Sequence, residues 1–437
     1  MKKNYWMVLG LLIVSLLSSC AGMPVPVTGA VGVSSAAAPL MINPVPTPAP
    51  ASDTPEDYNP LTGLPVNNPD NLLVPPALVS VTNWPPSARP QAGLSFSPIV
   101  FELYIGEGMS RFLAMFYGDF PTTVSEEEGN SKVGANSGSP TVQGAEAAVG
   151  PIRSGRLPYE SLRSIYNGFL VMASAYRGVA ANLSQHSNVF GSDSDDINSA
   201  LIPVDKLEGI AQSTKKQLGE AALSGMVFDD TAPQGGQTVD RFWFIYNAID
   251  MILWQYDPDI ESFRRYQDQA DGKTFNQFTD RLNGDSLTYE NIILLYANHR
   301  GCTESAFDID LMYINRAPAV LLRDGKAYNI YWSTANGEYE RTTGKLRPIR
   351  FIDANGEPFP LKPGQTWVYL LPTGTPTWEA PDKEEIPVNT PQWVAPNAQA
   401  LLYNLLNNKE PGSGNWVSRY YASMIPYDKA VCDKIKK

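Results

Sequence analysis

The sequence is poor in the residues that bind metals and attack substrates, with three cysteines and two histidines among 437 residues. It contains no Cys-x-x-Cys pair and no cluster of cysteine with histidine, so it offers no zinc site of the usual ligand spacing. It also lacks the Gly-x-Ser-x-Gly motif of many serine hydrolases. His186 lies in a polar stretch and His299 beside an arginine, which favours surface roles for both. We therefore predict no metal and no cofactor, and we treat enzymatic activity as uncertain, with the balance against it.

Positive charge is also scarce. Lysine and arginine number 33 against 45 acidic residues, which gives a formal net charge of -12. Nucleic-acid binding proteins usually present a basic face, so we predict no nucleic-acid partner. The same balance argues against strong electrostatic adhesion to anionic lipid. Net acidity of this size is typical of a protein that is kept soluble by its charge.

No apolar run reaches the length of about 20 residues that a membrane-spanning helix needs. The N-terminus instead has the form of a signal peptide, with Lys2 and Lys3 before the uncharged run 6–17. That run ends in Leu17-Ser18-Ser19-Cys20, which resembles a bacterial lipobox. We predict removal of residues 1–19 and lipidation of Cys20 by acyl chains such as palmitate. The alternative is an ordinary signal peptide with a chance cysteine.

The prediction for Cys20 sets the compartment of the rest of the chain. The lipid would hold the protein at the cell membrane, on its extracytoplasmic face, with the membrane as its first partner. Cys302 and Cys432 would then lie where disulfides persist, and an even remainder of two favours one bridge between them. Two free buried thiols remain the alternative.

Composition divides the mature chain into four parts. Residues 20–57 are rich in proline, alanine and serine, which predicts an extended tether after the lipidated cysteine. Residues 58–235 carry both strand and helix patterns, including a hairpin over 98–118 and helices near 158 and over 203–218. Residues 236–375 read as a β-rich part, a mainly antiparallel meander, and 376–437 as a C-terminal extension with a helix over 395–407. The expected fold class is α+β: a mixed α/β N-terminal part and a mainly antiparallel β C-terminal part.

Seven phrases in a fixed order resemble one family, the YerB-like bacterial lipoproteins, which are defined by a domain of unknown function (DUF3048) with N- and C-terminal parts. The phrases span residues 59–372 and read NPLTGLPV (59–66), ARPQAGLSFSPIVFE (88–102), GMSRFLAMF (108–116), GPIRSGR (150–156), FRRY (263–266), NIILLYA (291–297) and LKPGQTWVYLLP (361–372). The resemblance implies a lipid-anchored N-terminus and two parts of mixed α/β character. It implies no reaction.

The chain departs from the family's pattern at three places. The family tends to read Glu-Gly-Gly-x-Thr-Arg where this chain has Gly-Glu-Gly-Met-Ser-Arg over 106–111. It tends to carry histidine where this chain has Met172, and again within a Pro-His-Asn phrase where this chain has Pro233-Gln234-Gly235. Any histidine chemistry elsewhere in the family is therefore in doubt here.

Four arginines in the family phrases are the leading site candidates: Arg89, Arg111, Arg153 and Arg156. Each lies beside small or turn residues, where the backbone can approach a ligand closely. Guanidinium groups bind carboxylate and phosphate through paired hydrogen bonds, and Ser154 with its neighbouring N–H groups would add donors. The pattern predicts a pocket for an anionic small molecule or cell-wall component. The alternative is that these arginines pair with nearby carboxylates and only hold loops together.

Glu102 and Glu107 are weak catalytic candidates. Glycoside hydrolysis needs two carboxyl groups about 5–9.5 Å apart, and the sequence does not set the separation of these two. The aspartates of 192–196 alternate as in a calcium loop but lack its glycine and distal glutamate, so a solvated turn is the better interpretation.

Together these features favour a lipid-anchored protein of the cell envelope that binds an anionic ligand, a glycan or a partner protein. An envelope hydrolase that acts on a glycan or phosphoester is the alternative.

Overall fold

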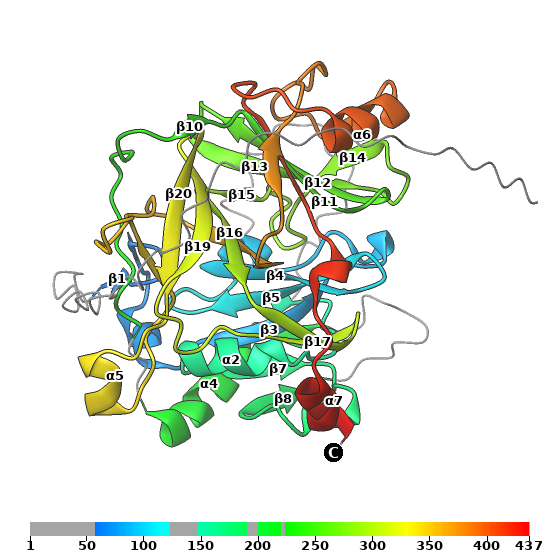
Figure 1. The fold of residues 1–437 in the computed structure, drawn as a ribbon. Helices are drawn as coiled ribbons and strands as arrows, with labels where there is room; N and C mark the ends of the chain where they lie inside the picture. Colours follow the sequence, from blue (N-terminus) through cyan, green and yellow to red (C-terminus); the bar gives the residue numbers. More distant parts are fainter. Residues whose placement is uncertain (1–56, 123–146, 190–199, 220–222, 437) are drawn as a thin grey trace, which may run out of the picture. The chain divides into compact units, whose positions relative to one another are not determined.

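The computed structural model describes residues 57–122, 147–189, 200–219 and 223–436. This part of the chain is mostly β-structure with few helices, arranged in two large sheets and three two-stranded ones (Figure 1). The predicted signal peptide, Cys20, residues 20–56 of the tether and the acidic stretch 192–196 lie outside the described residues. None of the described helices combines the length and the apolar character that crossing a membrane requires.

The larger sheet has eleven strands in the order β10-β20-β19-β16-β22-β4-β5-β3-β7-β8, with β21 paired to β20. Its strands are β3 (Ala77–Thr82), β4 (Ile99–Gly106), β5 (Met109–Phe116), β7 (Phe169–Met172), β8 (His186–Asn188), β10 (Gln237–Thr238), β16 (Asn291–Ala297), β19 (Ala317–Arg323), β20 (Lys326–Ser333), β21 (Arg350–Ile352) and β22 (Thr366–Pro372).

The second sheet has eight strands in the order β23-β25-β11-β12-β13-β14-β24, with β15 paired to β13. They are β11 (Arg241–Asn247), β12 (Asp250–Asp257), β13 (Ser262–Asp268), β14 (Thr274–Gln277), β15 (Thr288–Tyr289), β23 (Thr377–Glu379), β24 (Gln392–Val394) and β25 (Asn415–Arg419).

Helices and small sheets complete the described chain. The α-helices are α2 (Pro158–Ile165), α3 (Arg177–Ala180), α4 (Val204–Leu218), α5 (Glu338–Thr343), α6 (Ala398–Asn407) and α7 (Lys429–Lys436). Four short 3₁₀ turns are Pro69–Leu73, Pro86–Ala88, Leu94–Phe96 and Ala422–Met424. The two-stranded sheets pair β1 (Tyr58–Asn59) with β2 (Leu64–Pro65), β6 (Ala148–Val149) with β9 (Ile202–Pro203), and β17 (His299–Thr303) with β18 (Ala306–Ile309).

Strands from both predicted halves of the chain share the larger sheet. β22 runs parallel to β4 on one side and parallel to β16 on the other, so a C-terminal strand joins the N-terminal strands to the rest of the sheet. The domain boundary near residue 235 and the α+β class stay predictions. The single meander expected over 236–375 is wrong. Strands β11–β15 belong to the second sheet, β10, β16 and β19–β22 belong to the larger one, and β17 and β18 form a small sheet of their own. Alternation along a strand shows which residues share a face, but it does not specify the neighbouring strand.

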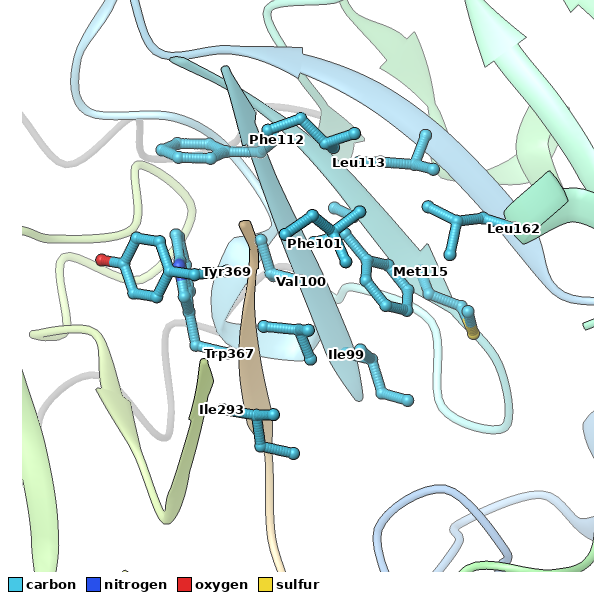
Figure 2. Packing of buried hydrophobic residues seen from close by; sticks show 14 of the residues in the cluster. Ile99, Val100, Phe101, Phe112, Leu113, Met115, Leu162, Ile293, Trp367 and Tyr369 are labelled. Carbon is cyan, nitrogen blue, oxygen red and sulfur yellow. The ribbon is translucent and has the colours of Figure 1, made fainter. Parts of the chain in front are cut away.

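The hairpin of β4 and β5 divides the core into two sides. Phe101, Leu113 and Met115 point toward Leu162 of α2, whereas Phe112 points toward Trp367 on the other side (Figure 2). In the register of this hairpin Leu103 lies opposite Arg111, and Glu102 lies opposite Phe112. Residues that lie opposite in a β-pair share a face, so Arg111 belongs to the α2 side and Glu102 to the side of the second sheet.

Candidate functional site

Arg111 lies in the middle of the larger sheet, where β5 is flanked by β4 and β3. The residue is only 8% exposed. Its Nη1 donates to the carbonyl of Ser154 at 2.7 Å, while its buried Nε has no hydrogen-bond partner. A buried guanidinium atom without an acceptor costs free energy, so this position is not explained by stability alone.

Arg153, Ser154 and Arg156 lie in the loop between β6 and α2. Two backbone hydrogen bonds hold this loop against the end of β7: Ala173 N–H donates to the Arg153 carbonyl at 3.0 Å, and Gly155 N–H to the Ser174 carbonyl at 2.9 Å. A Cβ at Gly155 would lie 2.8 Å from Leu183 Cδ1 and would also meet Met172 Sδ, so a larger residue there would displace both side chains. The loop therefore packs so closely on β7 that the two arginines flanking Gly155 are kept beside Arg111.

The three arginines form one electropositive cluster, which we call the arginine cluster (Arg111, Arg153 and Arg156). Burial, together with the charges of Arg156 and Arg153, lowers the pKa of Arg111 to about 9. Burial also lowers the pKa of Arg156, whose buried Nε lacks a hydrogen-bond partner. Among the described residues, no carboxylate pairs with Arg111 or Arg156. The loop-holding alternative, in which carboxylates neutralise these arginines, does not describe Arg111 and Arg156.

Helix α2 begins directly after the cluster and has no side-chain cap. Leu157 occupies its N-cap position, Pro158 opens the helix, and no side chain bonds to its first N–H groups. A helix N-terminus carries a partial positive charge, which favours an anion. At this one Pro158 has no N–H, and the N–H groups of Tyr159 and Glu160 donate to the carbonyls of Arg156 and Leu157. The helix end and the arginine cluster thus attract the same kind of ligand.

Arg89 does not join the arginine cluster. Its Nη1 donates to the Asp268 carbonyl at 2.7 Å, its Nε donates to the Asn83 carbonyl at 3.2 Å, and its guanidinium lies 5.5 Å from the ring centre of Trp84. Burial lowers the pKa of Arg89 to about 10, and the nearby carboxylates of Asp250, Asp268 and Glu102 oppose that shift. The four candidate arginines therefore divide into three on the α2 side and one beside the acidic residues.

Glu102 and Glu107 are placed apart from the arginine cluster and in different surroundings. Glu102 is fully buried and accepts three hydrogen bonds: from Ser110 Oγ at 2.7 Å, from Trp367 Nε1 at 2.9 Å and from Arg265 Nη2 at 3.2 Å. Glu107 is exposed in the turn between β4 and β5. A carboxylate enclosed by three donors is not available to a substrate, so these residues do not make a hydrolytic pair.

A buried polar network that the sequence analysis missed connects the two large sheets at Glu102. Arg265 of β13 is fully buried, pairs with Glu102 and also donates to Gln267, which donates to Asp250 at 2.7 Å. Trp84 Nε1 donates to the other Asp250 oxygen at 2.8 Å. Four aromatic rings surround the Arg265 guanidinium at 4.4–5.6 Å: Phe112, Trp254, Phe278 and Trp367. The phrase FRRY (263–266) was the available signal, but a sequence does not show that an arginine in a strand is enclosed.

The surroundings of the two remaining cysteines and of the buried histidine suit structural roles. Cys302 and Cys432 are joined in a disulfide with a Cα–Cα distance of 4.7 Å, which ties α7 to β17. His299 is buried rather than at the surface, stacked on Phe307 with its Nδ1 3.0 Å from the Ala297 carbonyl, and burial lowers its pKa to about 4. His186 is exposed on β8. No group of three or more metal-ligating side chains occurs within the described residues.

Comparison with protein families matches two stretches of the chain. Residues 61–127 match the N-terminal domain of a protein of unknown function, DUF3048, and residues 244–368 match its C-terminal domain. The chain contains both DUF3048 domains. The first DUF3048 domain includes Arg89, Glu102 and Arg111, and the second includes Arg265 and Cys302.

A curated relative and a solved structure resemble these DUF3048 domains and the chain around them. The relative is named "Putative lipoprotein YerB", from Bacillus subtilis (strain 168), and is 23% identical over 329 residues, which cover 72% of this chain and 86% of the relative. A crystal structure of YerB protein from Bacillus subtilis matches with a TM-score of 0.53 and 22% identity, over 72% of this chain and 96% of that one. At this identity the structural likeness shows a shared fold.

Proposed function

We propose that this protein is a lipid-anchored envelope protein on the extracytoplasmic face of the cell membrane, and that it binds an anionic ligand at the arginine cluster. One observation carries the proposal: Arg111 is buried without a carboxylate partner among the described residues, and two further arginines lower its pKa. Proteins seldom keep such a cation unless a bound anion compensates it.

The surroundings of the cluster support an anion over a neutral ligand. Guanidinium groups reach the site from β5 and from the loop before α2, and the uncapped N-terminus of α2 follows that loop directly. Neither candidate glutamate lies where it would repel an anion at the cluster. Glu102 faces the second sheet, and Glu107 lies in the turn between β4 and β5. Binding an anion would supply the acceptors that the buried Nε atoms of Arg111 and Arg156 lack.

The location rests on the sequence and on a relative. The segment Leu17-Ser18-Ser19-Cys20 resembles a lipobox, and the Bacillus subtilis relative is named as a lipoprotein. A lipid on Cys20 would place the described residues beyond a proline-rich tether, in water outside the cytoplasm. The ligand would then be a component of the envelope or of its surroundings.

The test is a titration of the full-length chain, purified in detergent, with inorganic phosphate at constant ionic strength. We expect heat of binding for the wild type, and affinity at least tenfold weaker for Arg111→Gln and Arg156→Gln, which is the loss of about 1.4 kcal/mol or more per charge-assisted contact. Arg316→Gln is the matched control, because Arg316 is exposed and stacks on Tyr331 away from the cluster. Equal binding by all four proteins, or no binding by any of them, would count against the proposal.

A further inference from the structure

The Cys302–Cys432 disulfide borders an open hollow. Cys302 is half-buried and lines a hollow of about 390 Å³ between β17 and residues of 422–427, the segment that leads to α7. Cys432 is only 2% exposed. Thiol–disulfide exchange needs access to one of the two sulfur atoms, and the other sulfur leaves. Cys302 is therefore the cysteine that an attacking thiol can reach.

Helix α7 depends on this disulfide for much of its attachment. The helix has eight residues, and helices shorter than about 12–15 residues are marginal in water without tertiary contacts. Its other contacts include the buried side chain of Val431 and the ion pair of the half-exposed Lys434 with Asp308. An exposed ion pair contributes little stability. Breaking the disulfide should therefore release α7.

The docked α7 lies directly against α3. A Cβ at Gly178 would collide with the backbone of Ile435, so the two helices meet backbone to backbone. Asn182 Nδ2, in the turn after α3, donates to the Lys434 carbonyl at 3.0 Å and to the Gly178 carbonyl at 2.7 Å. These contacts fix α3 and the turn that follows it.

The segment around α3 in turn holds the loop of the arginine cluster. Leu183 packs on Gly155, since a Cβ at this glycine would lie 2.8 Å from Leu183 Cδ1, and Gly155 N–H donates to the Ser174 carbonyl at 2.9 Å. The neighbouring Ser154 carbonyl accepts from Arg111 Nη1 at 2.7 Å. Packed contacts therefore run from α7 through α3 and its flanks to the arginine cluster, which is the kind of contiguous network that can couple two sites.

We infer that reduction of the Cys302–Cys432 disulfide by a dithiol weakens anion binding at the arginine cluster. This inference rests on the proposed function and adds its regulation. A thiolate of the dithiol attacks Cys302 Sγ, the bond between the two cysteines breaks, and Cys432 leaves as a thiolate that takes up a proton. The second thiol then displaces Cys302, so two electrons and two protons pass from the dithiol to the protein. Helix α7 leaves α3, and the loop of the cluster loses a support.

The experiment measures the affinity of the full-length chain for inorganic phosphate, oxidised and after reduction with dithiothreitol, an uncharged dithiol, by calorimetric titration in detergent. We expect binding at least about fivefold weaker after reduction, which is the lower end of typical coupling between two sites. The double variant Cys302→Ser/Cys432→Ser should bind as weakly as the reduced wild type and should not respond to dithiothreitol. Asn397→Ala is the matched control, because it removes the N-cap of α6 and so weakens a different helix. It should keep the wild-type affinity.

Hydrogen exchange of backbone amides supplies a second readout that needs no ligand. Reduction should speed the exchange of Gly155 N–H, whose acceptor lies in the segment before α3, and should leave the amides of β12 unchanged.

The outcomes separate the inference from the proposal beneath it. If complete reduction leaves the phosphate affinity or the exchange of Gly155 unchanged, while Arg111→Gln still loses binding, the inference fails and the proposed function stands. An equal loss of affinity in Asn397→Ala would show that any weakened helix has this effect, and it would also overturn the inference. If the oxidised wild type binds no phosphate, both fail.

Discussion

At the scale of single residues, two of the buried arginines lie in opposite surroundings. Arg265 pairs with Glu102 inside four aromatic rings, whereas Arg111 faces other arginines. Both lie in family phrases, and the sequence alone does not distinguish them. Alternation along β5 could place Arg111 on one face of the strand, but whether a carboxylate meets that face depends on which strands become its neighbours.

The contrast between Arg111 and Arg265 makes a paired prediction. Arg265→Gln should lower the free energy of unfolding by about 3–5 kcal/mol, because it leaves the Glu102 carboxylate buried without its cation. In phosphate-free buffer Arg111→Gln should lower it by less than about 1 kcal/mol, or raise it, because it removes a buried cation that has no carboxylate partner among the described residues. Urea unfolding followed by tryptophan fluorescence measures both. Equal losses for the two variants would mean that Arg111 is an ordinary structural residue.

Asp250 predicts a particular dependence of stability on pH. Burial raises the pKa of this carboxyl from 3.8 to about 7, although Arg89 opposes the shift. Between these two values the unfolded chain releases the proton and the folded chain keeps it, so the contribution of Asp250 to stability is lost as pH rises through that window. The side chain of the Asp250→Asn variant does not take up or release a proton in this pH range. The variant should therefore gain stability relative to the wild type between about pH 4 and about pH 8.

The measurement for Asp250 is a pair of urea unfolding profiles across that pH range. Asp268 and His299, whose pKa values are also shifted, are common to both proteins, so their effects cancel in the difference. A constant difference in unfolding midpoint from acid to neutral pH would contradict the prediction. An Asn side chain at position 250 has one acceptor oxygen, so it can accept from Gln267 or from Trp84. Loss of the other hydrogen bond changes the stability difference by the same amount at every pH and does not make it depend on pH.

At the scale of elements, local sequence patterns predicted helices and hairpins, but they did not predict which strands pair across long stretches of the chain. The β4–β5 hairpin and helix α4 lie where the sequence places them. Their signals are local: strand alternation, helical periodicity and turn residues. The parallel pairing of β22 with β4 joins residues far apart in the chain, and no local pattern encodes it.

Helix α7 is the element whose attachment is most open to test. It is held by the Cys302–Cys432 disulfide, by the Lys434–Asp308 ion pair, and by contact of Ile435 with Gly178 of α3. The disulfide closes a separation of 130 residues. Cys432→Ala should lower the free energy of unfolding by about 2–4 kcal/mol.

The control for this prediction is the reduced wild type. Reduction should bring the wild type to the stability of Cys432→Ala, while the variant itself should not respond to reductant. Limited proteolysis should cleave the variant near α7 before any other described helix. If the variant and the oxidised wild type unfold at the same urea concentration, the disulfide contributes nothing to α7.

At the scale of the whole molecule, the two DUF3048 matches do not correspond to two separate sheets. β16, from the second match, and β22, which begins at the end of that match, lie in the larger sheet beside β4 of the first match. The Glu102–Arg265 pair and its aromatic surroundings connect that sheet to the second one. Composition could divide the sequence into segments, but it does not reveal that strands from different segments join in one sheet.

This arrangement predicts that the N-terminal part does not fold by itself. A fragment of residues 57–235 would leave β4 as an open edge and Glu102 without Arg265 and Trp367. Exposed edges and unpaired buried charges favour aggregation and unfolding. The fragment should therefore show no cooperative urea transition, in contrast to the full-length chain. A cooperative transition of ordinary stability would indicate an independent domain.

The most direct measurement of the central claim is a crystal structure of the full-length chain with bound tungstate, a heavy-atom analogue of phosphate. The account predicts an anomalous peak within hydrogen-bond distance of the guanidinium groups of Arg111 and Arg156, at the start of α2, and no such peak in Arg111→Gln. Crystals in which tungstate occupies other sites while the arginine cluster stays open to solvent and empty would contradict it.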